Sequence, residues 1–134
     1  MSGDLRAGVV GVGALGRQHA RVWAGVPGAR LAGVMDADPA RAAAVAAEHG
    51  GRVFERLEDL LLEVDAVSVA VPTVDHHRVA RQAIEAGRAV LLEKPMTATL
   101  EEADDLLALS RERGVALQVG HIERFNPATA ALLS

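Results

Sequence analysis

The sequence predicts a doubly wound α/β domain, in which helices cover both faces of a parallel sheet. Short apolar runs rich in valine and leucine alternate with longer segments of helical periodicity along the chain. Half of the 134 residues are hydrophobic, and only Trp23, Phe54 and Phe125 are aromatic, so Val, Leu, Ile and Ala must form the core. This composition is typical of buried parallel strands beneath alanine-rich helices. A chain of this length has room for one domain.

Six short apolar runs are predicted as the strands of this sheet. They cover residues 7–12, 31–36, 52–54, 66–71, 89–93 and 116–119. The alternation of strands with helical segments favours parallel pairing, because parallel strands need long crossover connections. The sequence therefore predicts a six-stranded parallel sheet.

The ends of the helices carry their own signals. Asp38 can cap a helix whose first position is Pro39, and Gly50 follows the end of that helix. Thr99 and Glu102 have the spacing of a capping box. Three further glycines stand where helices should stop, namely Gly25, Gly87 and Gly114.

Charge and composition exclude several classes of protein. Fourteen basic against 18 acidic residues give a net charge of -4, which argues against nucleic acid as a partner. The absence of cysteine excludes disulfide scaffolds and zinc-thiolate sites, and no metal site is expected. No apolar run approaches the roughly 18 residues of a membrane span, and the N-terminus lacks signal-peptide features. We therefore expect a cytoplasmic protein that does not bind membranes.

A glycine-rich turn joins the first predicted strand to the helix that follows it. The turn consists of Gly11, Val12, Gly13, Ala14, Leu15 and Gly16. Three glycines at this spacing between a strand and a helix are typical of a dinucleotide-binding (Rossmann) unit. Gly11 permits the tight turn, Gly13 lets backbone N–H groups approach a pyrophosphate, and Gly16 lets the helix lie close to its strand. The positive end of the helix then binds the phosphates.

Asp36 stands twenty residues after Gly16, at the end of the second predicted strand. A carboxylate at this place binds ribose hydroxyls and repels a 2′-phosphate, so the sequence predicts NAD as the cofactor rather than NADP. In the alternative interpretation, Asp36 only stabilises the turn that leads to Pro39. Arg41 could reach a 2′-phosphate and favour NADP, although a solvated position on the helix is its commoner use.

The segment Val71-Pro72-Thr73 ends the fourth predicted strand beside the point where the strand order reverses. Its carbonyl edge should therefore face the cofactor crevice. His76 and His77 follow at the start of the next helix. Because adjacent helical residues point to different faces, a metal site shared by the two histidines is not favoured. Histidines at such positions are commonly cap or packing residues.

Lys94 is the only lysine among fourteen basic residues. An ammonium group can donate a proton, whereas a guanidinium stays charged at any relevant pH. The segment Glu93-Lys94-Pro95 directly follows the fifth strand, at the end where ligands bind in doubly wound sheets. This placement favours a functional lysine over a chance surface residue. We also predict that a cis Lys94–Pro95 bond fixes the direction of the lysine.

Together these motifs resemble those of the glucose-fructose oxidoreductase, inositol dehydrogenase and MocA-like (Gfo/Idh/MocA) oxidoreductases. The matching segments are the glycine-rich turn with Arg17 and His19, residues 71–76, residues 93–95 and residues 120–127. The resemblance implies an NAD-dependent dehydrogenase that transfers hydride between nicotinamide and the hydroxyl or carbonyl of a sugar or sugar nucleotide. Residues 120–127 look most like the subgroup of UDP-N-acetylglucosamine 3-dehydrogenases.

The resemblance also implies roles for single residues. Lys94 would be the catalytic residue that reaches the nicotinamide, Pro72 and Thr73 would line the cofactor, and His19 would be structural. The cofactor contacts expected beyond the glycine-rich turn are Asp36, Arg41, Val71, Pro72, Thr73, His76, Glu93 and Lys94.

The expected domain organisation is a cofactor domain over residues 1–120 and a linker over residues 121–134. Residues 128–133 would begin a helix that leads to the second, C-terminal substrate domain of the family, which is missing here. The isolated chain should then bind NAD without efficient turnover of a sugar. Two alternatives are a non-catalytic module that senses the redox state of NAD, and a homodimer formed through exposed surface or the C-terminal helix.

Overall fold

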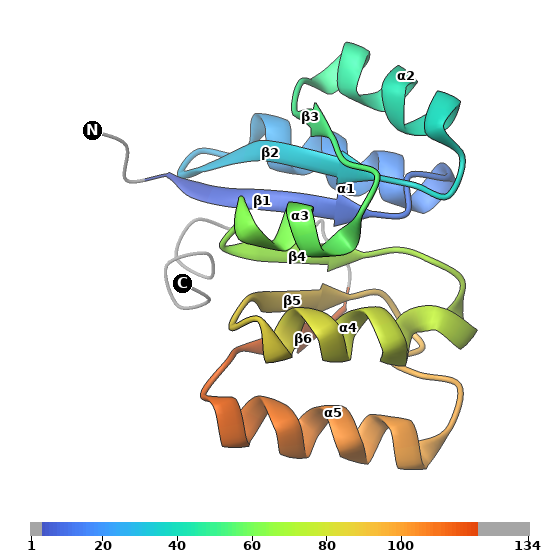
Figure 1. Ribbon diagram of the computed structural model, residues 1–134, viewed down its shortest axis with the longest axis vertical. Coiled ribbons are helices and arrows are strands. Elements are labelled where there is room, and N and C mark those ends of the chain that lie inside the picture. The colour runs from blue at the N-terminus through green and yellow to red at the C-terminus, as the bar shows by residue number, and fades with distance from the viewer. Residues whose placement is uncertain (1–3, 121–134) are drawn as a thin grey trace.

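The computed structural model describes residues 4–120, which form a six-stranded parallel sheet in the order β3-β2-β1-β4-β5-β6 (Figure 1). The strands are β1 (Leu5–Val10), β2 (Ala29–Met35), β3 (Arg52–Val53), β4 (Ala66–Val69), β5 (Ala89–Leu92) and β6 (Leu117–Val119). The helices are α1 (Ala14–Gly25), α2 (Pro39–His49), α3 (Leu57–Leu62), α4 (His76–Glu85) and α5 (Leu100–Arg113), and a 3-10 turn, η1 (Thr73–Asp75), precedes α4. The predicted doubly wound sheet is confirmed.

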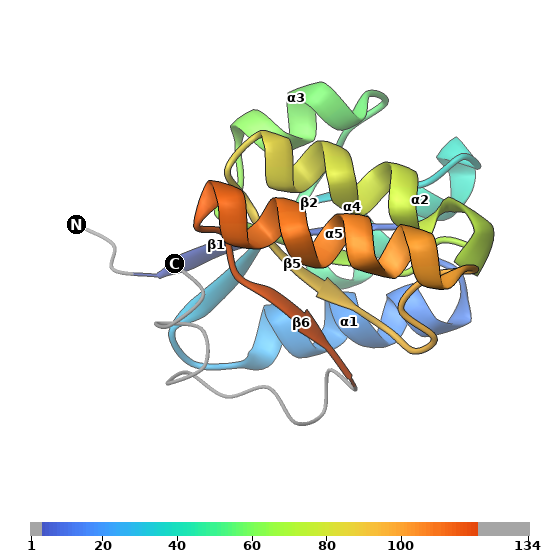
Figure 2. The same ribbon diagram turned by 90° about the horizontal axis from the view of Figure 1, so that it is seen from below.

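Helices cover both faces of the sheet (Figure 2). Residues of α1 and α2 form one apolar layer with the sheet, and residues of α3, α4 and α5 form the other. The strands β4 and β5 are buried along their whole length, which explains their unbroken apolar sequences. Trp23 of α1 is fully buried and donates its indole N–H to the Ser68 hydroxyl of β4 at 2.8 Å. This bond satisfies two polar groups inside an otherwise apolar layer.

The sheet grows in two directions from its central strand β1, with β2 and β3 on one side and β4, β5 and β6 on the other. The loops that follow β1 and β4 diverge at this reversal and leave a crevice between them. In the register of the sheet, Val10 pairs with both Met35 and Val69, and Val69 pairs with Leu92. The residues that follow these four positions therefore lie in one row along the carboxyl edge of the sheet.

Most helix ends follow the predicted signals. Asp38 caps α2 with its side chain, which accepts the Ala40 N–H at 3.0 Å. The positive φ angles of 89°, 79° and 63° belong to Gly50, Gly87 and Gly114. Gly25 differs, because it is the last residue inside α1. The residue that caps this helix is Val26, whose φ of -81° is negative.

Only half of the predicted capping box forms at α5. The Thr99 hydroxyl accepts the Glu102 N–H at 3.2 Å, as predicted. The Glu102 carboxylate instead turns toward α4, where its Oε2 lies 3.9 Å from the His77 Nδ1. In a complete capping box the Glu102 carboxylate would accept the Thr99 N–H. Here it contacts His77 and so links α5 to α4.

The other differences lie at the ends of strands and at one short helix. Strand β1 covers residues 5–10 instead of 7–12, and β2 begins at Ala29 instead of Leu31. The strand β3 has two residues instead of three, and β4 ends at Val69, so that Val71 lies in the loop beyond it. Helix α3 was not predicted, because its six residues are too few to show a period and no side chain caps its start.

The predictions for residues 121–134, including a helix over residues 128–133 and a dimer formed through it, lie outside the described residues. Within the part of the chain that the structure describes, no helix is long and apolar enough to cross a membrane.

Candidate functional site

The glycine-rich turn after β1 has a backbone that two of its glycines make possible. Gly11 has a φ of +90°, and a Cβ there would lie 2.8 Å from backbone atoms of Ala70 and Val71. A Cβ at Gly16 would lie only 1.7 Å from the Gly11 carbonyl oxygen. The fold itself therefore requires both glycines, one for the turn and one for the close approach of α1.

Gly13 is different, because its φ of -69° suits any residue. A Cβ at this position would meet only the Arg41 Nη1, at an ordinary contact distance of 3.4 Å. Gly13 stands at the start of α1, where no side chain caps the helix. The space above the turn is thus one that a Cβ would fill and a phosphate could occupy, with uncapped helical amides beside it. These residues fit the pyrophosphate of a dinucleotide.

Asp36 directly follows β2 and is held against the glycine-rich turn. Its Oδ1 accepts the Val12 N–H, and its Oδ2 accepts the Asp38 N–H, both at 2.8 Å. The side chain is only 9% exposed. A carboxylate has about four acceptor positions, so two remain for ribose hydroxyls. The stabilising role in the turn and a cofactor role are therefore compatible.

Arg41 of α2 lies between the glycine-rich turn and two carboxylates. Its Nε is 3.5 Å from the Asp36 Oδ2, and its Nη2 is 3.8 Å from the Asp38 Oδ2. The side chain remains 45% exposed. The guanidinium thus partly neutralises the carboxylate that is predicted to repel a 2′-phosphate.

A cleft of about 710 Å³ opens at the carboxyl edge of the sheet, within the usual size range of small-molecule sites. Its lining includes eight of the predicted residues, namely Gly11, Gly13, Ala14, Leu15, Asp36, Arg41, Val71 and Pro72. Val12 and Gly16 also belong to the glycine-rich turn, but both are buried. Thr73, His76, Glu93 and Lys94 are not among the residues that line the cleft.

Two further groups of lining residues were missed by the sequence analysis. One is the segment that follows β3 and begins α3, with Glu55, Arg56, Leu57 and Glu58. The other is one side of η1 and α4, with Asp75, Arg78, Val79 and Gln82. The first group follows a predicted strand and lies at the same sheet edge. The second has helical spacing. Strand ends and helical period could therefore have identified both groups, although neither contains a motif.

The segment Glu93-Lys94-Pro95 leaves β5 in the row of strand ends described above. The Glu93 side chain turns inward, is 4% exposed, and places its Oε1 2.9 Å from the Nε2 of His19 on α1. Lys94 is exposed, and the Lys94–Pro95 bond is cis, as predicted. The structural role implied for His19 therefore has a partner in Glu93, while the expected cofactor contact of Glu93 stays a prediction.

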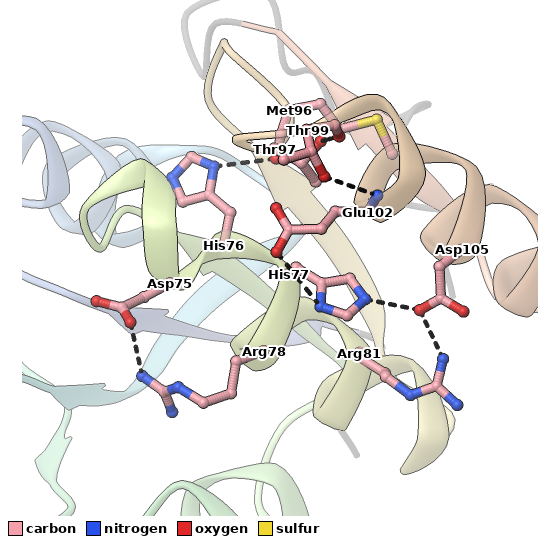
Figure 3. A network of polar contacts seen from close by, with 10 residues as sticks. All are labelled: Asp75, His76, His77, Arg78, Arg81, Met96, Thr97, Thr99, Glu102 and Asp105. Carbon is pink, nitrogen blue, oxygen red and sulfur yellow. Dashed lines mark hydrogen bonds and ion pairs between the residues drawn. The ribbon is translucent and has the colours of Figure 1, made fainter.

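The two adjacent histidines of α4 point to different partners (Figure 3). His76 is buried, and its ring nitrogens approach the backbone carbonyls of Val71, Pro95 and Met96 at 2.9 to 3.1 Å. On the other side of the helix, the His77 Nε2 lies 2.7 Å from the Asp105 Oδ2 of α5.

Arg81 joins the same contact between the helices, with its Nη1 2.6 Å from the Asp105 Oδ2. The hydrogen bonds from His77 and Arg81 hold the pKa of the Asp105 carboxyl below its ordinary value. His77, Arg81 and Asp105 thus fix α4 against α5.

The geometry as a whole defines a dinucleotide-binding domain, because a glycine-rich turn, an uncapped helix and a fixed carboxylate meet at one cleft at the reversal of strand order. A family model described as "Oxidoreductase family, NAD-binding Rossmann fold" matches residues 5–121. The chain belongs to this family of oxidoreductases, in which NAD is the cofactor.

Individual relatives agree with this assignment. The UDP-N-acetylglucosamine 3-dehydrogenase of Acidithiobacillus ferrooxidans is 49% identical over 124 residues, which are 92% of this chain and 39% of the relative. Inositol 2-dehydrogenase 1 of Saccharopolyspora erythraea is 43% identical over an alignment of 129 residues that covers 92% of this chain and 38% of the relative. The chain therefore spans about two fifths of the length of these curated relatives.

Solved structures give the same result. The structure of the Acidithiobacillus ferrooxidans enzyme matches with a TM-score of 0.85 and 48% identity, covering 96% of this chain and 42% of that one. GenD2 from gentamicin A biosynthesis, in complex with NAD, matches with a TM-score of 0.85 and 38% identity, covering 90% of this chain and 35% of that one.

Proposed function

We propose that this chain is the NAD-binding part of a dehydrogenase that oxidises or reduces a sugar or a sugar nucleotide. The observation that carries the proposal is the cleft that joins Gly13 to Asp36, because it offers space for a pyrophosphate next to a fixed acceptor for ribose hydroxyls. The names of the relatives, which are dehydrogenases of a sugar nucleotide and of inositol, support the substrate class.

Each group at the carboxyl edge has a part in this proposal. The first amides of α1 bind the pyrophosphate, Asp36 accepts hydrogen bonds from the ribose, and Val71, Pro72 and Thr73 line the continuing path of the cofactor. NAD, when bound, supplies the hydride acceptor or, as NADH, the donor. A cytoplasmic location belongs to the same proposal.

Lys94 is assigned to the substrate oxygen. Its exposed ammonium follows β5 in the row of strand ends and can donate a hydrogen bond or a proton to an oxygen whose charge changes during the reaction. The complementary base would come from a part of the enzyme outside this chain. The isolated chain is therefore expected to bind the cofactor without efficient turnover.

Calorimetric titration with NAD, NADH and NADPH tests the cofactor assignment. We expect saturable binding of NAD and NADH by the chain, and weaker binding by Asp36→Asn because one acceptor becomes a donor. Asp38→Asn is the matched control, since asparagine caps α2 as well as aspartate does. Equal affinities for NAD in all three proteins would contradict the role of Asp36.

Turnover is tested separately by following NADH formation with UDP-N-acetylglucosamine and with inositol. Slow or absent formation is expected, and a robust kcat with the 134-residue chain would contradict the need for a further domain.

A further inference from the structure

The side chain of His76 joins two loops that leave neighbouring strands. This first residue of α4 is 3% exposed. Its Nε2 lies 2.9 Å from the carbonyl oxygen of Val71, in the loop after β4. Its Nδ1 lies 3.1 Å from the carbonyl oxygens of both Pro95 and Met96, in the loop after β5. A single buried ring thus contacts the backbone of the loop after β4 and that of the two residues that follow Lys94. Figure 3 shows His76 beside the segment that holds Met96 and Thr97.

The loop of residues 94–99, here called the Lys94 loop, is anchored at its far end, where Thr99 caps α5, and by the packing of Met96 against an apolar layer. Lys94, Pro95, Ala98 and Thr99 are exposed. The Thr97 hydroxyl donates to the Thr99 carbonyl at 2.7 Å, which is a bond within the loop itself. The contact with His76 attaches the backbone of Pro95 and Met96 to α4. It adds to the Glu93–His19 contact before Lys94 and to the packing of Met96 against the apolar layer.

The chemistry of the contact sets the requirement at position 76. A carbonyl oxygen only accepts hydrogen bonds, and a neutral imidazole carries one N–H, so a single tautomer donates either through Nδ1 to the Lys94 loop or through Nε2 to Val71. A proton on Nδ1 serves the Lys94 loop, and a proton on Nε2 serves Val71. An unpaired carbonyl in a buried setting costs free energy, which favours a donor at this position over an apolar side chain.

Helix α4 is itself held in place from its other side. His77 and Arg81 both contact Asp105 of α5, and neither contact involves the Lys94 loop (Figure 3). The two adjacent histidines therefore have different roles. His77 holds α4 against α5, and His76 connects α4 to the Lys94 loop.

We infer that His76 is a positioning residue for Lys94, holding the Lys94 loop beside the loop after β4 through the Nδ1–H of its ring. This inference rests on the proposed function, in which Lys94 lies at the nicotinamide end of the cofactor. His76 acts through the loop backbone and has no contact with the reacting atoms. Removal of its Nδ1 donor displaces Lys94 while leaving the glycine-rich turn and Asp36 unchanged.

The single lysine of the chain makes the inference measurable. Reductive methylation with ¹³C-formaldehyde labels Lys94 and the N-terminal amine only, so the spectrum contains one dimethyl-lysine signal. His76→Gln places its amide near Nε2 and loses the donor to the Lys94 loop, whereas His76→Asn places its amide near Nδ1 and keeps that donor. His77→Gln is the matched control on the same helix.

We expect His76→Gln to shift the Lys94 signal of the free chain and to lose most of the change that NAD causes in it. The Lys94 signal of His76→Asn and its response to NAD should be closer to those of the chain without substitutions. Those of His77→Gln should be indistinguishable from them. Circular dichroism verifies that each variant is folded. A folded His76→Gln with the same Lys94 signal and the same response to NAD would overturn the positioning role.

A second measurement needs no variant. The protonated ring nitrogens of His76 are identified from ¹⁵N chemical shifts of the unmodified chain, and a ring without a proton on Nδ1 would also overturn the inference. A different result would contradict the proposed function. In that case calorimetry shows that NAD binds, but the dimethyl-Lys94 signal of the methylated chain without substitutions does not change when NAD is added.

Discussion

Gly13 and Gly16 stand three residues apart in one turn, but a glycine is needed at the two positions for different reasons. The chain itself requires Gly16, whose Cβ would lie 1.7 Å from the Gly11 oxygen. Within residues 4–120, a Cβ at Gly13 would meet only the Arg41 side chain, at an ordinary contact distance, so this side of the turn has room for a ligand. Sequence alone gives all three glycines of the pattern equal weight, and only the geometry separates a folding role from a binding role.

Two alanine substitutions test this separation. Gly16→Ala should lower the free energy of unfolding by at least about 1–3 kcal/mol, as overpacking against backbone does. Gly13→Ala should lower stability by at most about 1 kcal/mol, because alanine is a poorer N-cap than glycine, and should weaken NAD binding at least about tenfold. Urea unfolding and calorimetry measure the two effects. Normal NAD affinity in Gly13→Ala would place the pyrophosphate elsewhere.

Arg41 is a residue at which cofactor selectivity is expected to change while the Asp36 carboxylate itself is kept. Its guanidinium lies 3.5 Å from Asp36 and offsets part of the negative charge that opposes a 2′-phosphate. We expect Arg41→Ala to weaken NADPH binding by about tenfold or more, because charge-assisted hydrogen bonds contribute about 1.5–3 kcal/mol. NADH binding should change much less. Parallel titrations with both cofactors measure the ratio, and an equal loss for both would contradict this assignment.

Among the elements, β1 and β4 are joined by a polar contact at their starts. The Arg6 Nη2 lies 3.1 Å from the Asp65 Oδ1, and the Arg6 backbone N–H donates to the Oδ2 at 2.8 Å. Burial raises the pKa of Asp65, but the hydrogen bonds from Arg6 outweigh it and leave that pKa below its ordinary value of 3.8.

The sign of this shift fixes the pH dependence. A carboxyl whose pKa is lower in the folded state stabilises the fold fully above its ordinary pKa, and the contribution is lost as the pH falls through the folded value. Urea midpoints between pH 6 and pH 2 should therefore fall more for the unmodified chain than for Asp65→Asn. The difference should be at most about 1 kcal/mol, since both side chains are about one third exposed. Parallel curves would contradict this contribution.

The elements also mark how far the sequence predicts the structure. Strong apolar runs placed all six strands, and Asp38, Gly50 and Gly114 placed helix ends, because each acts through local backbone chemistry. Helix α3 was not predictable because its six residues are too few to show a period. The polar contacts of Glu102 were not predictable because they depend on which helices become neighbours in the fold. For the same reason, the pattern indicated the site but not the partners of Glu93 and His76.

On the scale of the whole molecule, the two apolar layers share one sheet and should unfold together. Trp23 is the only tryptophan of the chain and lies in one layer, whereas circular dichroism reports helices of both. We expect coincident urea transitions for tryptophan fluorescence and circular dichroism. Separate midpoints would show that the layers are independent units.

Cofactor binding should stabilise this unit as a whole. At an NAD concentration of 100 times the Kd, the free energy of unfolding should rise by about 2.7 kcal/mol, which corresponds to roughly 10 °C in Tm. Scanning fluorimetry with increasing NAD measures the shift, and Gly13→Ala serves as the control that stays folded. An unchanged Tm at saturation, as judged by calorimetry, would mean that NAD binds the unfolded chain equally well.

The shortness of β3 bears on how these domains behave in concentrated solution. An edge strand with free amide and carbonyl groups is a template on which another chain can add a strand and start an aggregate. At this edge only Arg52 and Val53 pair with β2, and the Arg52 guanidinium lies 4.8 Å from the ring centre of Phe54. Two residues, one of them charged, offer a short ladder for a foreign strand, so β3 itself is a poor template for aggregation.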